Sequence, residues 1–148
     1  MRKLIESALV SLDGVIEAPE RWANFDDEDA ALSMEELGKY DAFVMGRVTY
    51  EKFFANWGHV AGNPYIDLIN AMPKYVASRS LTEYGTSRFD NTLLRDRLID
   101  EFRFWIMPVV AGAGQRLFED VDTSGLHLTL THERRLKNGS VILTYAPG

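Results

Sequence analysis

The stretch from residue 41 to residue 51, DAFVMGRVTYE, most constrains the fold, because a short apolar strand runs directly into a helix there. Residues 41–45 have the pattern of a central strand that is buried on both faces. Residues 47–55 are expected to form the helix, with Gly46, Arg47 and Thr49 at its start. The first N–H groups of a helix lack partners and its dipole is positive there, so this start attracts anions. The segment therefore suggests a phosphate-bearing nucleotide cofactor.

Strands and helices alternate along the rest of the chain. The pattern predicts helices over 26–37 and 64–71, the second with Asn63 and Pro64 as its cap and first residue. It predicts strands over 3–10 and 74–78 and a buried apolar run over 102–110. Residues 126–134 and 140–145 flank Asn138-Gly139, the strongest local signal of a hairpin. The architecture is therefore α/β with a C-terminal antiparallel hairpin, which makes the sheet mixed.

Composition narrows the function classes. A chain of 148 residues, 46% of them hydrophobic, fits a single globular domain over 1–148. The formal charge of −6 argues against a general nucleic-acid or anionic-membrane binder. The absence of cysteine excludes disulfides and thiolate metal sites, and the three histidines are scattered, so no metal site is expected. The charged start does not resemble a signal peptide, and no apolar run approaches the roughly 20 residues that span a bilayer. We expect a cytoplasmic protein.

Six short segments, in order, resemble the dihydrofolate reductase-like family that includes the C-terminal reductase domain of the bifunctional riboflavin-synthesis deaminase–reductase. They are SLDGVIE (11–17), MGRVTYE (45–51), PKYVASR (73–79), LIDE (98–101), PVVAGAGQRLF (108–118) and LTY (143–145). The chain is most similar to the small stand-alone members of that family. The resemblance implies a three-layer α/β fold with a mixed sheet and flanking helices.

The resemblance also implies an NADPH site. Its Gly-Arg-x-Thr helix start would bind cofactor phosphate, and the residues after the next strand would meet the adenosine 2′-phosphate, which favours NADPH over NADH. A glycine-containing loop would lie near the same pocket, where glycine permits close backbone approach. The cofactor-binding residues implied in this way are Gly46, Arg47, Thr49, Ser78, Arg79, Gly112 and Gly114.

Three further residues are candidates for the substrate side. Asp13 lies in a loop that resembles the one covering the nicotinamide, and Asp27 falls near the catalytic acid of dihydrofolate reductases. Asp27 also belongs to an acidic run, 26–29, that simply complements a helix dipole. Trp22, in polar surroundings, is a candidate for lining a pocket for a flat heterocycle or for a subunit contact.

One departure from the family concerns the stretch after Arg79, where residues 80–97 replace a longer segment. One alignment makes Gly85-Thr86 a glycine turn followed by a helix over 88–97. The other, which the residue types favour, makes 88–94 a strand and loses the glycine turn. Under either alignment the sheet lacks an expected central strand.

Two functions are consistent with these observations. The first is an NADPH-dependent reductase that transfers hydride to a small heterocyclic or carbonyl substrate, with the cofactor supplying the chemistry and the protein the orientation. The second is a non-catalytic dimeric descendant of the same fold, a nucleotide-binding or structural protein. In both cases we expect a homodimer.

Overall fold

The computed structural model describes residues 2–77 and 92–148. The described residues fall into two compact units, 2–29 together with 92–148, and 30–77. Helix α1 (Asp27–Leu37) begins in the first unit and continues in the second. Each unit is described by itself below. The expectation of a single domain over 1–148 stays a prediction.

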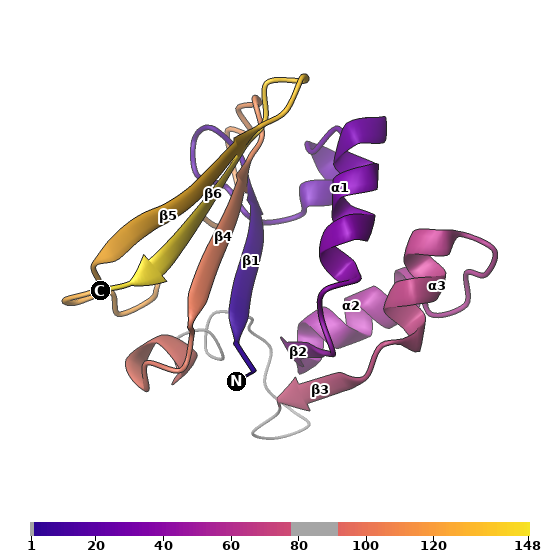
Figure 1. The fold of residues 1–148 in the computed structure, drawn as a ribbon, viewed down its shortest axis with the longest axis horizontal. Helices are drawn as coiled ribbons and strands as arrows, with labels where there is room; N and C mark the ends of the chain where they lie inside the picture. The colour runs from indigo at the N-terminus through magenta and orange to yellow at the C-terminus, as the bar shows by residue number, and fades with distance from the viewer. Residues whose placement is uncertain (1, 78–91) are drawn as a thin grey trace. The chain divides into compact units, whose positions relative to one another are not determined.

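The first unit is built on a four-stranded mixed sheet (Figure 1). Its strand order is β1 (Ile5–Val10), β4 (Glu101–Ile106), β6 (Val141–Pro147) and β5 (Leu128–Arg135). β1 pairs with β4 in parallel, whereas β4 with β6 and β6 with β5 are antiparallel. The predicted mixed sheet and C-terminal hairpin are therefore confirmed, although β1 begins two residues after the expected start and β4 ends at residue 106.

A hydrophobic cluster of this unit lies on one face of the sheet. Side chains alternate along β4, so Phe102 and Phe104 point to the same face, and both are buried. Phe118 crosses this face with its ring centroid 6.4 Å from that of Phe102 and 5.9 Å from that of Phe104. Fully burying one such side chain contributes about 1.5–3 kcal/mol. This cluster packs the sheet against the segment that contains Phe118.

The hairpin turn occupies the predicted place. The N–H of Leu136 donates to the carbonyl of Ser140 at 2.9 Å, and the N–H of Gly139 donates to the carbonyl of Leu136 at 3.1 Å. Gly139 has φ +90°, a conformation that glycine adopts without strain. The Asn-Gly pair therefore forms the turn because its glycine can take a positive φ.

The second unit contains a two-stranded parallel sheet of β2 (Phe43–Gly46) and β3 (Lys74–Ala77). They are connected through α2 (Arg47–Trp57) and α3 (Pro64–Ala71). Asn63 caps α3, since its side-chain Oδ1 accepts from the N–H groups of Tyr65 at 3.1 Å and Ile66 at 3.2 Å.

The expectation that residues 41–45 are buried on both faces is wrong. Met45 is buried, but the side chain of Val44 is 44% exposed. Within the described residues β2 pairs with β3 alone, so its other edge lacks the neighbour that a central strand has. Apolar composition identified the strand correctly but overstated its burial, because residue type does not report how many strands lie beside it.

The two alignments of the shortened segment predict different structures for residues 92–94, which the structure describes. Residues 92–95 are helical, with the N–H of Asp96 bonded to the carbonyl of Thr92 at 3.0 Å. The strand interpretation is thus wrong for 92–94, and the helix interpretation is right there. The remaining residues of this segment, 80–91, lie outside the described residues. In the part of the chain that the structure describes, no helix is long and apolar enough to cross a membrane.

Candidate functional site

The start of α2 is a helix N-terminus without a side-chain cap. Gly46 is the N-cap residue, with an extended backbone (φ −72°, ψ 157°), and it provides no side chain to cap the helix. Arg47 and Thr49 lie in the first turn and are half-buried. The Arg47 Nη1 atom is 3.5 Å from Oε1 of Glu51, one turn further along the helix. The end of the helix dipole and a guanidinium therefore lie together in the second unit.

Gly46 has no structural reason to be glycine. Its φ is one that any residue adopts, and a Cβ built on it would meet no atom of the described residues within 4 Å. Neither backbone strain nor crowding therefore selects glycine here. What glycine does provide is open space beside the first N–H groups of the helix, as close approach of a phosphate to the backbone requires. The residues present at this position fit the phosphate group of a cofactor.

A second group of predicted residues lies in the first unit, beyond the carboxyl ends of the parallel strands β1 and β4. The loop that follows β1 and the loop that follows β4 are joined by backbone hydrogen bonds. The N–H of Leu12 donates to the carbonyl of Val109 at 2.8 Å, and that of Ile16 to the carbonyl of Gln115 at 2.9 Å. The crevice outside the carboxyl ends of parallel strands is the usual ligand position in open α/β sheets.

The Asp13 carboxylate connects these two loops through hydrogen bonds. Its Oδ1 accepts from the Ser11 hydroxyl at 2.7 Å and from the N–H of Ala111 at 2.9 Å, and its Oδ2 accepts from the N–H of Gly112 at 2.9 Å. These donors favour the charged form and lower the pKa of Asp13 to about 2, with the Ser11 hydroxyl the largest cause. The structure thus brings Asp13 and Gly112 together, as neighbours that bind each other. A substrate-binding role for Asp13 stays a prediction.

Gly112 and Gly114, in the loop that follows β4, are glycine for different reasons. Gly112 has φ +82° with nothing within 4 Å of a Cβ, so only its backbone conformation selects glycine. Gly114 has φ +124°, and its Cβ would lie 2.9 Å from Cγ1 of Val15 and 3.3 Å from Oε2 of Glu17. The close approach that Gly114 permits is therefore an approach of the protein to itself. Cofactor contact by either glycine stays a prediction.

At the start of α1, the buried acid is not the one that the sequence analysis singled out. Asp27 is exposed, whereas Asp29 is completely buried, with Oδ2 accepting from Nδ2 of Asn138 at 2.6 Å and from the N–H of Asp26 at 3.1 Å. Sequence reasoning missed Asp29. The available signal was its spacing, since Asp29 lies three residues before the buried Leu32 on the same helical stripe.

Trp22 and Asp27 stay predictions as substrate-side residues. The Trp22 side chain is half-buried, and its Nε1–H donates to the carbonyl of Glu17 at 2.8 Å. That bond attaches the indole to the end of the loop that carries Asp13. The Asp27 side chain is exposed at the first position of α1. Its catalytic role stays a prediction.

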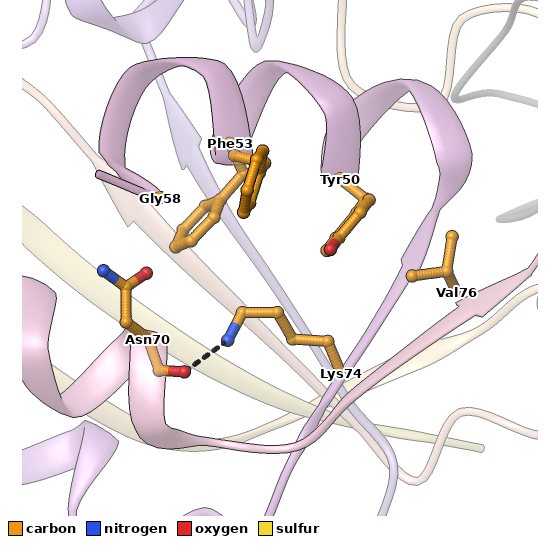
Figure 2. A pocket seen from close by; sticks show the side chains of 7 residues that line it. Tyr50, Phe53, Gly58, Asn70, Lys74 and Val76 are labelled. Atoms are coloured by element: carbon orange, nitrogen blue, oxygen red, sulfur yellow. Dashed lines mark hydrogen bonds between the residues drawn. The ribbon is translucent and has the colours of Figure 1, made fainter. Parts of the chain in front are cut away.

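A pocket of about 460 Å³ lies within the second unit, along the side of α2 (Figure 2). Its lining consists of Tyr50, Phe53, Phe54, Gly58, Asn70, Lys74 and Val76. Lys74 donates from Nζ to the carbonyls of Ile69 at 2.7 Å, Asn70 at 3.3 Å and Met72 at 2.9 Å. Burial lowers the pKa of Lys74. Because all three of its donors are used at the C-terminal end of α3, this ammonium acts as a helix cap.

The predicted residues are thus divided between the two units. Gly46, Arg47 and Thr49 share the start of α2, and the Asp13 loop joins the glycine loop of the other unit. Ser78 and Arg79 lie outside the described residues, so their predicted contact with a 2′-phosphate is untested. Among residues 2–77 and 92–148, no three histidine, aspartate or glutamate side chains gather as metal ligands.

Comparison with known proteins identifies the fold. Residues 82–142 match the family model of the RibD C-terminal domain. The sequence matches no curated protein. A putative riboflavin biosynthesis protein from Shewanella sp. PV-4 has a similar structure, with a TM-score of 0.69, 20% identity and coverage of 99% of each chain.

Two further structures, with lower sequence identity to this chain, have the same fold. Dihydrofolate reductase from Enterococcus faecalis, solved with NADP(H), has a TM-score of 0.56 at 14% identity, covering 99% of this chain and 96% of that one. RibD from Acinetobacter baumannii has a TM-score of 0.64 at 14% identity, covering 100% of this chain and 58% of that one. The chain therefore has the fold of dihydrofolate reductase-like proteins, and its sequence matches the RibD C-terminal domain over residues 82–142.

Proposed function

We propose that this protein is an NADPH-dependent reductase that transfers hydride to a small heterocyclic or carbonyl substrate. The RibD C-terminal domain match and the dihydrofolate reductase-like fold support a reductase-type function. The observation that carries the proposal for this chain is the start of α2. There Gly46 leaves open space beside uncapped N–H groups, and Arg47 adds a fixed positive charge.

Each set of residues has a part in this proposal. The N–H groups at the start of α2, with Arg47 and the Thr49 hydroxyl, bind a cofactor phosphate, and Ser78 and Arg79 meet the 2′-phosphate. Within the first unit, cofactor contact by Gly112 and Gly114 and a substrate-side role of Asp13 and Trp22 stay predictions from the family resemblance. Bound NADPH supplies the hydride. The accompanying proton comes from Asp27 or from water.

One interaction of Arg47 at the start of α2 is an ion pair with Glu51. Its partner Glu51 is 52% exposed, and an ion pair of this kind contributes about 0–1 kcal/mol. A charge-assisted hydrogen bond to phosphate contributes about 1.5–3 kcal/mol. The exposed ion pair with Glu51 is therefore the weaker of these two kinds of interaction.

Titration calorimetry on the full chain tests the proposal, with NADPH, NADH and 2′,5′-ADP as probes. We expect NADPH and 2′,5′-ADP to bind, and NADH to bind more weakly. Arg47→Ala should weaken NADPH binding at least tenfold, and Arg79→Ala should weaken it by removing the preference over NADH. Lys52→Ala is the matched control, since it removes the same charge from an exposed position of α2 and should leave the affinity unchanged.

Absence of NADPH binding at millimolar concentration would refute the reductase. The second candidate, a non-catalytic dimeric descendant that binds another nucleotide or serves a structural role, would then be preferred. The specific observation in its favour is the two-stranded sheet of the second unit, which lacks a further neighbour among the described residues. We also propose a homodimer, and sedimentation equilibrium tests it by whether the mass is that of one chain or of two.

A further inference from the structure

A buried carboxylate ties the start of α1 to the hairpin turn at 137–140. Asp29 is 0% exposed, and its Oδ2 accepts from Nδ2 of Asn138 at 2.6 Å. The other end of the same amide accepts from the N–H of Ser140 at 2.9 Å. A second bond runs in parallel, from the N–H of Lys137 to Oε2 of Glu28 at 2.9 Å. The turn is thus held from inside by one side-chain amide whose two ends are both used.

The Asn138 amide is the main side-chain donor to Asp29. The Oδ1 atom of Asp29 has no hydrogen-bond partner among the described residues, and Oδ2 accepts from one backbone N–H in addition to Asn138. A buried carboxylate that loses a donor is strongly destabilised, because its charge has already been removed from water. The position of Asn138, and with it the turn, is therefore fixed more tightly than an exposed hairpin turn would be.

The 137–140 turn also packs against the end of β4. The Ser140 hydroxyl lies 3.5 Å from Sδ of Met107, and both residues are buried. A Cβ on Gly139 would lie 3.6 Å from Cβ and Cγ of Pro108, so the turn backbone rests on the proline ring. Pro108 is followed at once by the loop whose Ala111 and Gly112 N–H groups bind Asp13.

We propose that Asp29 is a positioning residue that fixes the loop of residues 109–114 through the 137–140 turn and Pro108. Asp29 does not touch that loop: it holds Asn138, the turn rests on Pro108, and Pro108 sets where the loop begins. The effect on cofactor binding rests on the proposed function and on the predicted cofactor contact of Gly112 and Gly114. The structural part of the proposal, that Asp29 controls the order of the 109–114 loop, does not depend on the proposed function.

A charge exchange on the full chain tests the proposal. Asn138→Asp places a second carboxylate against Asp29 and should drive the turn away. The double variant Asp29→Asn/Asn138→Asp restores one amide and one carboxylate in reversed positions. Amide hydrogen exchange at Ala111 and Gly112, followed by NMR, is the readout, with the N–H of Phe104, in the middle of β4 between its two partner strands, as the sheet reference. Glu133→Gln, on the exposed part of β5, is the control variant.

We expect Asn138→Asp to accelerate exchange at Ala111 and Gly112 at least tenfold relative to Phe104, and the double variant to return both rates to near wild type. Equal acceleration at all three amides, or rescue of stability without rescue of the two loop amides, would overturn the proposal. If Asn138→Asp does not fold, Asn138→Ala removes the donor without adding a charge, and the same selective acceleration is required. NADPH affinity, measured in parallel, should follow the loop rates. A wild-type chain that binds no NADPH refutes the proposed function but leaves the exchange result to decide this inference.

Discussion

Gly114 should be the least replaceable glycine of the loop that follows β4, and the structure gives the size of the effect. Replacing it by alanine forces a residue with a side chain to φ +124°, which costs about 1–3 kcal/mol. The new methyl group would also lie 2.9 Å from Cγ1 of Val15, which is completely buried. Overpacking against such a residue adds about 1–3 kcal/mol. We therefore expect Gly114→Ala to lower the free energy of unfolding by about 3 kcal/mol.

Gly112→Ala is the matched control, because Gly112 lies two residues away in the same loop. Its φ of +82° carries the conformational cost, but the methyl group would meet nothing within 4 Å. The expected loss is about 1–2 kcal/mol, from the backbone alone. The difference between the two variants isolates the contact with Val15.

Urea denaturation measures both values. With an m-value of about 2 kcal/mol/M, Gly114→Ala should lower the midpoint by roughly 1.5 M, and Gly112→Ala by roughly 0.5–1 M. In a Val15→Ala background the clash is absent, so Gly114→Ala should then cost only its conformational part. Equal losses for the two glycines, or a loss at Gly114 that is the same in both backgrounds, would refute the packing explanation.

Three further predictions follow from single residues. Gly46→Ala should leave the midpoint of urea denaturation unchanged or slightly raised, since nothing crowds its Cβ, yet weaken NADPH binding about tenfold in calorimetry. Because the folded-state pKa of Asp13 is lowered to about 2, its stabilising contribution is present above its usual pKa of 3.8 and is lost as the pH falls toward 2. Asp13→Asn should flatten this part of the urea midpoint against pH. Lys74→Met, which keeps the aliphatic stem but removes the cap of α3, should cost about 1–2 kcal/mol by the same measurement.

The parts of the fold that the sequence predicted well are those fixed by local chemistry. Asn63 before Pro64 specified the start of α3 because the cap and the first residue lie within one turn. Asn138-Gly139 specified the hairpin because the turn needs a positive φ at one residue. In both cases two adjacent residues contain the whole cause, so one sequence is enough to find it.

What could not be predicted depends on partners distant in the sequence. Nothing near Asp13 shows that its carboxylate accepts from N–H groups 98 and 99 residues away. The pairing of Asp29 with Asn138 spans 109 residues. The short helix at 92–95 was the less favoured alternative for another reason, since the run Phe89-Asp90-Asn91-Thr92 suits a strand or turn better than a helix interior, although Leu93, Leu94 and Arg95 are good helix formers. Long-range contacts override propensity, and a single sequence does not record them.

The three glycines of the proposed cofactor site show how strongly each supports function. For Gly114 the packing of Val15 explains the residue, and for Gly112 the positive φ explains it, so neither requires a ligand. Gly46 is different, because its backbone is ordinary and no atom of residues 2–77 and 92–148 would crowd a Cβ there. Glycine there lowers helix-start stability relative to Ser or Asp, which would cap α2. A residue that costs stability and serves no packing or conformational need is most simply explained by what must approach it, and at an uncapped helix start beside Arg47 that is an anion.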